Sequence, residues 1–569
     1  MIAARFRSRN AWGSVVVALG LLACQSSDLR PATPTAASPA SSLATRTPIL
    51  ATPTPVPVIA TPTPVPARAL SWIENGVLYL VHVGSFNDAD GDGTGDLSGL
   101  KQKLDYLNDG DPSTTDDLGV SVLCLLPVFS ATSAHGFDTL DHFAIRPEYG
   151  SRADLLDLVG DCHRRGMKVI LQYVMGYVSD QQAFFQHAYD HEPSAYSEWF
   201  QWLDYPQTRY RALDGVPTLP LLNGASRGVQ EYALRVARYW MDLDGDGNCG
   251  DGVDGYLCDR PSLLPASFWE RLRAQCKGLR PDFVLAASLA PSADGAVASY
   301  QEPFDAVLDI LLHSALTGSE KGSESSVLGG AGRSELIATA LAQKAELYPQ
   351  GALGIGYLSA PDSDRIMSVV HADMQRARLA ATMLFTLPGV PMLYYGEEIG
   401  MAGERDTTQP FGSDYCREPM DWYAVEQGAG MPTWFRPDGR GNRAGDGVSV
   451  EEQTSDPGSL LNLYRRLIRM HGTHSALRLG SSERIALEED RPYVGAYLRQ
   501  DAEDRVLVVF NLDHTPTAAT LLLGSAPIPS GVWNVVDLLG TRMCPAYSGG
   551  GYSLDLGAQE ALVLGLERR

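Results

Sequence analysis

The stretch Gly255-Tyr256-Leu257-Cys258-Asp259 is a short apolar run that ends on a single carboxylate. Seven further strand-like runs occur between Val77 and Tyr395, and stretches with helical periodicity lie between them. Eight buried strands that alternate with helices are typical of a (β/α)8 TIM barrel. The order of these segments therefore predicts an α/β fold built on a closed parallel barrel.

A doubly wound open sheet has the same alternation and is the structural alternative. No glycine-rich dinucleotide fingerprint follows the first strand, which weakens that alternative. The predicted strands are Val77–Val83, Val120–Val128, Val169–Val174, Gly255–Asp259, Phe283–Ala287, Ala306–Leu312, Leu353–Leu358 and Pro391–Tyr395. The clearest predicted helices are Ala153–Arg165, Val229–Leu243, Phe268–Gly278, Gln375–Leu387 and Leu460–His471.

Two segments extend this barrel. Residues 177–227 separate the third strand from its helix, which is too long for an ordinary βα loop and predicts a small inserted domain. After His471, alternating apolar residues predict a C-terminal antiparallel β-sandwich. We place the barrel at residues 69–480 and the sandwich at residues 481–569. Half or more of the aromatic residues of the insertion are expected to form its own core: Trp199, Phe200, Trp202, Tyr205 and Tyr210.

The N-terminal residues predict export. An arginine-rich start precedes an apolar run at Val15–Leu22, which is the pattern of a secretory signal peptide and is too short for a membrane-spanning helix. The run ends in Leu-Leu-Ala before Cys24, and this ending resembles a bacterial lipobox. We predict that residues 1–23 are a signal peptide and that lipidated Cys24 anchors an extracytoplasmic protein to its membrane.

Residues 24–68 are rich in Pro, Thr, Ala and Ser, and Ala-Thr-Pro-Thr-Pro-Val-Pro occurs at Ala51–Pro57 and again at Ala60–Pro66. Such a composition cannot bury a core and favours extended polyproline conformations. At about 3.1 Å per residue, this tract spans up to ~130 Å. We predict a stalk between the membrane and the folded part.

Composition and charge exclude some classes of partner. The 569 residues carry a formal net charge of -23, which argues against nucleic acid and against electrostatic docking on anionic lipid. It suits a well-solvated protein with a neutral ligand. Seven cysteines follow Cys24 without a C-x-x-C spacing, which argues against a zinc site and leaves room for one disulfide of unknown pairing.

Three motifs carry a family resemblance. Ser133–Asp138 reads Ser-Ala-His-Gly-Phe-Asp, Leu393–Met401 reads Leu-Tyr-Tyr-Gly-Glu-Glu-Ile-Gly-Met, and Arg417–Trp422 reads Arg-Glu-Pro-Met-Asp-Trp. They resemble the HGYD segment, the turn after the eighth strand and the R-x-P-M-x-W segment of glycoside hydrolase family 13, the α-amylase and α-glucosidase family. The resemblance extends from Trp72 to the C-terminus and implies the same order of barrel, inserted domain and sandwich.

The resemblance implies a set of site residues. Asp259 takes the position of the catalytic nucleophile, and Asp362 takes that of the carboxylate that stabilises the transition state. The implied ligand is α-glucan or a maltooligosaccharide. Four further residues take positions that line the first sugar subsite: His135, Phe137, Asp138 and Arg417.

Other catalytic positions depart from the family. Retaining hydrolysis needs a second carboxylic acid ~5–5.5 Å from the nucleophile, and the family supplies a Glu at the end of the fifth strand. Ser288 occupies this position, and its hydroxyl cannot act as a general acid near neutral pH. The Arg two residues before the nucleophile is Leu257. Tyr177 and Pro361 take the positions of the two His of the family's site. Gln172 takes the position of the Asp in the family's first catalytic region, at the third strand.

Two of these losses compensate each other. In the family, the first-region Asp and the fourth-strand Arg form a buried charged cluster with the nucleophile. Removing one partner leaves a buried charge unpaired, which costs roughly 3–5 kcal/mol of stability, whereas replacing both partners by neutral residues costs almost nothing. Gln172 and Leu257 look like such a joint replacement. We therefore expect an intact fold with impaired chemistry. Without the Arg, Asp259 and Asp362 should repel each other, which raises the pKa of one of them unless a cation or a water lies between them.

Two acidic loops are candidates for metal binding. Asp88–Asp96 offers oxygen ligands at alternating positions, as a hard cation requires, and resembles the calcium loop of the α-glucosidase-like branch. A second loop, Asp242–Asp251, begins in the same way, and its sequence leaves a metal site and a solvated turn as equal alternatives. The predicted Ca²⁺ ligands are Asp88, Asp90, Asp92 and Asp96, with the Thr94 carbonyl.

The expected protein is a lipid-anchored member of the α-amylase family. It either binds α-glucan or serves as a partner subunit of another protein, and it hydrolyses glucan little or not at all. A bare inherited scaffold without a ligand is the less specific alternative. The rival hypothesis is an active retaining α-glucosidase or α-amylase whose acid comes from elsewhere, such as Glu302 or a loop Glu. A transferase or isomerase needs the same acid. A carboxyl group ~5–5.5 Å from Asp259 discriminates these cases.

Overall fold

The computed structural model describes residues 72–569, apart from residues 192, 290–302, 319–325, 331, 348–352, 407, 409–413, 426, 436–441 and 541. Three predictions lie outside the described residues: the signal peptide with Cys24, the stalk, and Glu302 as an alternative acid.

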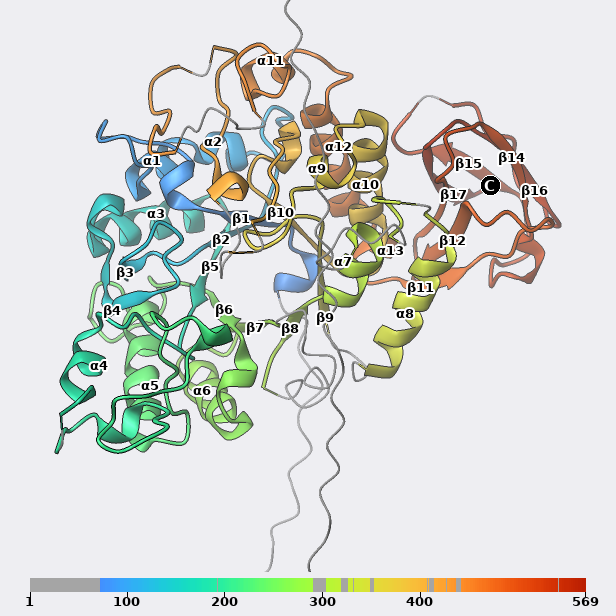
Figure 1. Ribbon diagram of the computed structural model, residues 1–569. Helices are drawn as coiled ribbons and strands as arrows, with labels where there is room; N and C mark the ends of the chain where they lie inside the picture. The colour runs from blue at the N-terminus through green and yellow to red at the C-terminus, as the bar shows by residue number, and fades with distance from the viewer. Residues whose placement is uncertain are drawn as a thin grey trace, which may run out of the picture. The chain divides into compact units, whose positions relative to one another are not determined.

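Eight parallel strands close into a barrel, which confirms the predicted (β/α)8 fold (Figure 1). The first strand pairs with the second and also with the eighth, so the open-sheet alternative is wrong. In order around the barrel the strands are β1 (Leu78–Val81), β2 (Val122–Leu125), β5 (Lys168–Tyr173), β6 (Gly255–Asp259), β7 (Val284–Ser288), β8 (Ala306–Leu308), β9 (Leu353–Tyr357) and β10 (Val390–Tyr394).

The barrel strands are apolar because both of their faces are covered. All four residues of β2 and all five residues of β6 are buried, as is usual for parallel strands between a barrel interior and an outer layer of helices. The helices of the described residues are α1 (Leu97–Gln102), α2 (Leu104–Leu107), α3 (Arg152–Arg164), α4 (Ala183–Ala188), α5 (Arg227–Met241), α6 (Ala266–Leu279), α7 (Ile310–Thr317), α8 (Glu335–Leu347), α9 (Ile366–Val369), α10 (Met374–Thr386), α11 (Val450–Thr454), α12 (Leu460–Thr473) and α13 (Ser475–Arg478).

One strand prediction is wrong in its extent. The apolar run Ala306–Leu312 contains a three-residue strand, β8, and then the start of helix α7. Between them, an Asp309 side-chain oxygen accepts a hydrogen bond from the Leu312 N–H at 3.1 Å, which caps the helix. A buried helix and a buried strand are both apolar, so hydrophobicity alone did not mark this boundary.

The insertion after β5 has a core of its own, as predicted. Phe200, Trp199, Trp202 and Tyr210 belong to this core or pack against it, and the Phe200 and Trp202 ring centroids lie 5.7 Å apart. Tyr205 is the exception, with 78% of its surface exposed. The chain also forms a two-stranded sheet that was not predicted, β3 (Phe129–Ala131) with β4 (Thr139–Ile145), between the second barrel strand and α3.

The C-terminal residues form two antiparallel sheets over a shared core. Leu507 and Leu564 from the larger sheet and Leu521 and Leu554 from the smaller one belong to this core, which agrees with the predicted sandwich. The larger sheet has the order β11 (Ser481–Arg484), β12 (Val494–Gln500), β13 (Arg505–Asn511), β17 (Ala561–Arg568) and β15 (Trp533–Asp537), and the smaller pairs β14 (Thr517–Leu521) with β16 (Tyr552–Leu556).

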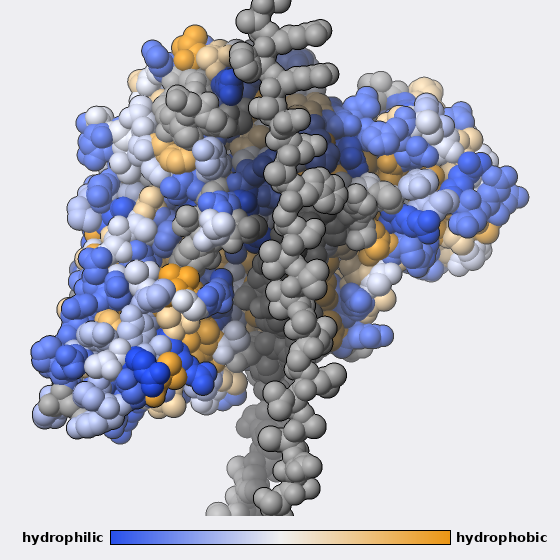
Figure 2. All heavy atoms as spheres, in the orientation of Figure 1, coloured by the Kyte–Doolittle hydropathy of each residue, from blue (hydrophilic) through white to orange (hydrophobic). Residues whose placement is uncertain are grey.

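Hydrophilic residues spread over the face shown in Figure 2, with small hydrophobic patches between them, in keeping with the large negative charge. The seven cysteines of the described residues are free thiols, so the disulfide for which the sequence leaves room is not formed among them. Within the same residues, no helix combines the length and apolar composition needed to cross a bilayer.

Candidate active site

The carboxyl ends of β6 and β7 bring the decisive pair of residues together. Asp259 is the last residue of β6, and it pairs in register with Ser288, the last residue of β7. One step deeper in the barrel, Leu257 pairs with Gln172 of β5. The structure therefore places the jointly replaced residues side by side, and it places the hydroxyl of Ser288 on the strand next to the candidate nucleophile.

Asp259 is buried and hydrogen bonded. Only 8% of its surface is exposed. The Tyr177 hydroxyl donates to Asp259 Oδ2 at 2.8 Å, and Gln172 Nε2 donates to Oδ1 at 3.4 Å. Burial is the main cause that raises the pKa of Asp259 to about 6, and the charge of Asp362 adds to the rise. The expected rise is thus present, but burial rather than repulsion dominates it.

Tyr177 has a role that the sequence analysis missed. The resemblance to the family marks it only as a lost His, whereas the structure makes it a buried donor to Asp259. An antiparallel bridge to Leu221 fixes its backbone at the start of the insertion. Burial raises the pKa of Tyr177 well above its ordinary value, so the hydroxyl keeps its proton and continues to donate.

Arg260 is the second residue that sequence reasoning missed. It directly follows Asp259 in a left-handed conformation, with φ 41°. Its guanidinium forms an ion pair with Asp214 of the insertion at 2.7 Å, and Asp214 also has a positive φ, 49°. The positive charge of Arg260 partly offsets the rise in the pKa of Asp259. An arginine therefore lies beside the carboxylate after all, at a position that strand alternation alone assigns to the opposite face.

Ser288 and Asp362 line one cavity of about 460 Å³ at the ends of β7, β8 and β9. Asp362 is exposed there, five residues beyond the end of β9. The other described lining residues are Leu289, Leu308, Ile310, His313, Ser314, Thr317, Gly318, Gly329, Tyr357, Ala360, Ser363, Asp364, Ser368, Val369, His371, Glu404 and Arg405.

His313 and Tyr357 form one wall of this cavity and were not predicted. Their rings stack with centroids 4.2 Å apart and an interplanar angle of 11°. Burial lowers the pKa of His313 to about 4, so the imidazole is neutral at pH 7. Neither residue belongs to a motif, and only the turn from β8 into α7 brings the His to the cavity.

The predicted subsite residues lie close together on the other side of the barrel mouth. The turn between β3 and β4 carries His135, Phe137 and Asp138, and the His135 and Asp138 side chains approach to 3.8 Å. Burial lowers the pKa of His135 to about 4, and the charge of Arg417 contributes to the lowering. The structure thus brings all four residues to one place. Phe137, Asp138 and Arg417 are 6%, 7% and 1% exposed, so they form the wall beneath the subsite.

Three carboxylates of the predicted calcium loop converge. Asp88, Asp90 and Asp96 each offer an oxygen within 4.8 Å of the others. Asp92 belongs to the same loop, but its carboxylate accepts a hydrogen bond from the Thr94 N–H at 2.7 Å and is not part of this cluster. The chemistry of the cluster suits a hard cation such as Ca²⁺. In the second loop, three carboxylates cluster in the same way: Asp242, Asp244 and Asp251.

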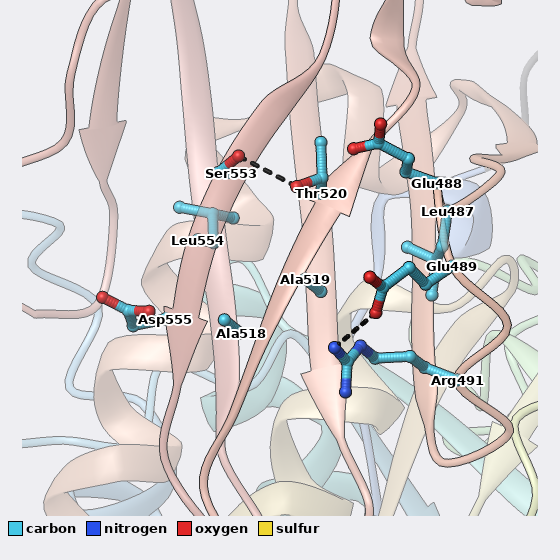
Figure 3. Close-up of a pocket in the computed structure, with 10 residues that line it drawn as sticks. All are labelled: Leu487, Glu488, Glu489, Arg491, Ala518, Ala519, Thr520, Ser553, Leu554 and Asp555. Carbon is cyan, nitrogen blue, oxygen red and sulfur yellow. Dashed lines mark hydrogen bonds and ion pairs between the residues drawn. The ribbon is translucent and has the colours of Figure 1, made fainter.

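A further hollow lies in the C-terminal sandwich and has a different character (Figure 3). It encloses about 310 Å³ between the segment Leu487–Arg491 and the sheet of β14 and β16. Glu489 pairs with Arg491 at 2.7 Å, and Thr520 bonds to Ser553 at 2.9 Å, as the dashed lines in Figure 3 mark. Among its described lining residues, none is aromatic and none belongs to a catalytic motif.

The raised pKa of Asp259 makes stability depend on pH. The folded protein keeps a proton that the unfolded chain releases between its ordinary pKa of 3.8 and about 6. The contribution of Asp259 to the free energy of unfolding should therefore fall by roughly 3 kcal/mol as the pH rises through this window and stay low above it. Denaturant titrations of the unmodified protein and of Asp259→Asn from pH 4 to pH 7 isolate this contribution, because the variant cannot ionise at this position and shares the other titrating groups. An equal slope in the two proteins would contradict the assignment.

Residues 80–480 match the sequence model of a family described as "Alpha amylase, catalytic domain". The chain is similar to Alpha-amylase 3 of Dictyoglomus thermophilum, with 27% identity over 462 residues, which are 78% of this chain and 85% of that protein. It is also similar to a cyclomaltodextrinase of a Bacillus species, with 28% identity over 455 residues, 76% of this chain and 69% of that protein.

The solved structures agree with these relatives. A crystal structure of the alpha-amylase from H. orenii superposes with a TM-score of 0.73 at 29% identity, covering 86% of this chain and 99% of that chain. The barrel, the insertion and the C-terminal sheets of this chain are therefore those of one established architecture.

Proposed function

Because this chain belongs to the α-amylase family of glycoside hydrolases, we propose that it binds α-glucan at the inherited site and that its hydrolytic activity is strongly impaired. The observation that carries the proposal is the pairing of Asp259 with Ser288 at the ends of β6 and β7. This is where a retaining enzyme needs its second carboxyl group. A hydroxyl there can donate a hydrogen bond to a sugar, but it cannot protonate a leaving oxygen near neutral pH.

Asp214 and Asp362, the two described carboxylates whose charges raise the pKa of Asp259, are poorly suited to replace the missing acid. Asp214 is held in an ion pair with Arg260, and a general acid must carry a proton rather than a charge. Asp362 is exposed at the cavity wall and already takes the position of the stabilising carboxylate. Binding, in contrast, needs only hydrogen-bonding groups and ring surfaces, and the cavity and the His135 cluster supply both.

Calorimetric titration of the purified protein with maltoheptaose tests the binding function. We expect a measurable Kd for this α-linked ligand and none for cellohexaose, whose β-linkages give the chain a different shape. His135→Ala should weaken binding, because this side chain is the most exposed of the inherited subsite cluster. A protein that binds neither ligand would contradict the proposal and would favour the role of a partner subunit or a bare scaffold.

We further propose that the protein is a lipoprotein anchored through Cys24 on the extracytoplasmic side of a membrane. The arginine-rich start, the short apolar run and the Leu-Leu-Ala-Cys ending support this location. The Pro- and Thr-rich tract at residues 24–68 is the proposed stalk. Such an arrangement would present a glucan-binding domain to the medium some distance from the membrane surface.

We also propose that Asp88, Asp90 and Asp96 hold Ca²⁺. Backbone donors already orient the cluster, because Asp88 accepts from Gly91 and Gly93, and Asp96 accepts from Ala89 and Gly99. The ion would supply a positive charge that offsets the repulsion of three carboxylates. It is proposed as a structural ion, since in the described part of the chain the side chains of Asp88, Asp90 and Asp96 accept hydrogen bonds only from backbone N–H groups between Ala89 and Gly99.

Chelation should lower the melting temperature if this loop binds a cation. A ligand that binds only the folded state at about 100 times its Kd stabilises it by roughly 2.7 kcal/mol. Differential scanning calorimetry with and without EGTA measures the shift. Asp90→Ala should remove the sensitivity, because Asp90 is an exposed member of the cluster, whereas Asp92→Ala should retain most of it. Identical melting curves with and without chelator would rule out the site.

A further inference from the structure

Three aromatic rings lie next to each other on the segments that follow β10, the last strand of the barrel. The Tyr415 and Phe435 ring centroids are 5.5 Å apart, and those of Phe435 and Trp434 are 5.3 Å apart. Tyr415 is 39% exposed, and Trp434 and Phe435 are half-buried. Rings inside a core are closed off from solvent, whereas these keep part of their surface accessible. The cluster is therefore a partly exposed aromatic surface.

One end of this surface adjoins the inherited subsite. Trp434 Nε1 donates to Ser85 Oγ at 3.1 Å, and Ser85 Oγ donates to the Arg417 carbonyl at 2.6 Å. The Trp434 ring also lies 5.8 Å from the ring of His82. His82 in turn bonds to the carbonyl of Ala134, the residue before the subsite His, at 3.0 Å. Two hydrogen bonds thus connect Trp434 to Arg417, and one ring contact and one hydrogen bond connect it to Ala134.

The other end adjoins the cavity that contains Ser288. Gly403 passes so close to the backbone of Tyr415 that a Cβ atom there would lie 2.4 Å from the Tyr415 carbonyl oxygen. The next two residues, Glu404 and Arg405, line the cavity. Arg405 also donates to the carbonyl of Asp362 at 3.1 Å. The aromatic surface therefore lies between the subsite and the cavity.

The acidic loop at Asp88–Asp96 fixes this surface. The N–H groups of Thr433 and Trp434 both donate to the Gly93 carbonyl, at 2.7 and 2.9 Å. The Asp88 N–H donates to the Gly430 carbonyl at 2.7 Å. Gly430 has φ +77°, and a Cβ there would lie 2.3 Å from Asn87 Oδ1, so only glycine allows this approach. The loop and the segment that carries Trp434 are thus one hydrogen-bonded unit.

We propose that Tyr415, Trp434 and Phe435 form a stacking surface for a glucose ring of an α-glucan, positioned by the Asp88–Asp96 loop. Sugar rings present apolar C–H faces that pack on aromatic rings, and their hydroxyls find polar partners at the rim. Here the rim holds Glu404 and Arg405 on the side of the cavity. The surface gives the chain a binding contact that does not depend on the missing acid. This inference rests on the proposed glucan-binding function.

Titration of the full-length protein in detergent with maltoheptaose tests the surface. Tyr415→Ala should raise the Kd about tenfold, the size expected for one lost ring contact. Tyr415→Phe keeps the ring and should bind within about twofold of the unmodified protein. Tyr493→Ala is the matched control, because Tyr493 is 36% exposed but precedes β12 of the C-terminal sheet; its Kd should not change. Equal melting temperatures show that the variants are folded.

The outcomes separate this proposal from the function on which it rests. No binding by the unmodified protein overturns the proposed function. Binding that Tyr415→Ala and Phe435→Ala leave unchanged overturns the stacking surface alone. Trp434→Phe, which loses the bond to Ser85, should weaken binding about threefold and reduce the change in tryptophan emission on titration. EGTA should weaken binding by the unmodified protein; an unchanged Kd would overturn the part assigned to the loop.

Discussion

Maltose hydrolysis by the purified protein is expected to remain at the background rate. General acid catalysis alone contributes about 10²–10⁴-fold, and a sugar alkoxide is a leaving group that needs it. Ser288 cannot supply the proton, and Leu257 and Pro361 remove polar groups that support the reaction in the family. The Tyr177 hydroxyl also donates a hydrogen bond to Asp259 Oδ2, which reduces the nucleophilicity of that carboxylate.

An aryl α-glucoside with a good leaving group needs little protonation, so any remaining turnover should appear with this substrate first. Turnover of this kind should disappear in Asp259→Asn. Ser288→Glu alone should recover little, because the missing groups act together in the family and their effects are not additive. Release of 4-nitrophenol and chromatography of maltose digests measure the two reactions.

A catalytically inactive Asp259→Asn sample, purified in parallel, controls for contaminating enzymes. Brisk turnover of maltose by the unmodified protein but not by this variant would show that an acid reaches Asp259 from elsewhere. The rival hypothesis of an active α-glucosidase or α-amylase would then be correct.

Replacement of Cys24 by Ala should move the protein from the membrane fraction to the soluble fraction. A diacylglyceryl group buries enough methylenes for stable attachment, at about 0.8 kcal/mol each, and Ala cannot carry it. Fractionation of expressing cells followed by immunoblotting measures the change, and mass spectrometry of the membrane-bound form should find the lipid on Cys24.

The control for this experiment is Cys544→Ala, which removes a half-buried thiol of the sandwich and should leave the protein with the membrane. Full membrane retention of Cys24→Ala would instead argue for an uncleaved N-terminal segment or for attachment through another protein.

The barrel was predictable from the sequence because its strands are short and apolar and alternate with amphipathic helices. The prediction for Gly255–Asp259 matches β6 residue for residue. The prediction for Ala306–Leu312 failed where Asp309 ends a strand and starts a helix, because the residues on both sides are apolar. The pair β3 and β4 was missed because β3 has only three residues and its register with β4 is irregular.

The candidate site was predictable only where the resemblance supplied a motif. Strand pairing then placed Ser288 beside Asp259, as the resemblance to the family implied. Arg260 was missed because its side chain reaches the site only from a left-handed backbone conformation, which no periodicity reveals. At Tyr177 the sequence indicated only that a His of the family is missing. The hydrogen bond to Asp259 could not be predicted, because it depends on how the insertion folds back over the barrel.

The pairing of Gln172 with Leu257 on adjacent strands limits the order in which evolution can restore the family's charges. Gln172→Asp as a first step would place a second carboxylate beside buried Asp259 with no arginine at position 257, at a cost of roughly 3–5 kcal/mol. Leu257→Arg as a first step faces a carboxylate with which it can pair. Restoring both residues of the family's pattern therefore avoids this cost only if Leu257→Arg comes before Gln172→Asp. Without an arginine at position 257, an aspartate at position 172 therefore carries this cost in stability, however few substitutions separate the chain from the family's pattern.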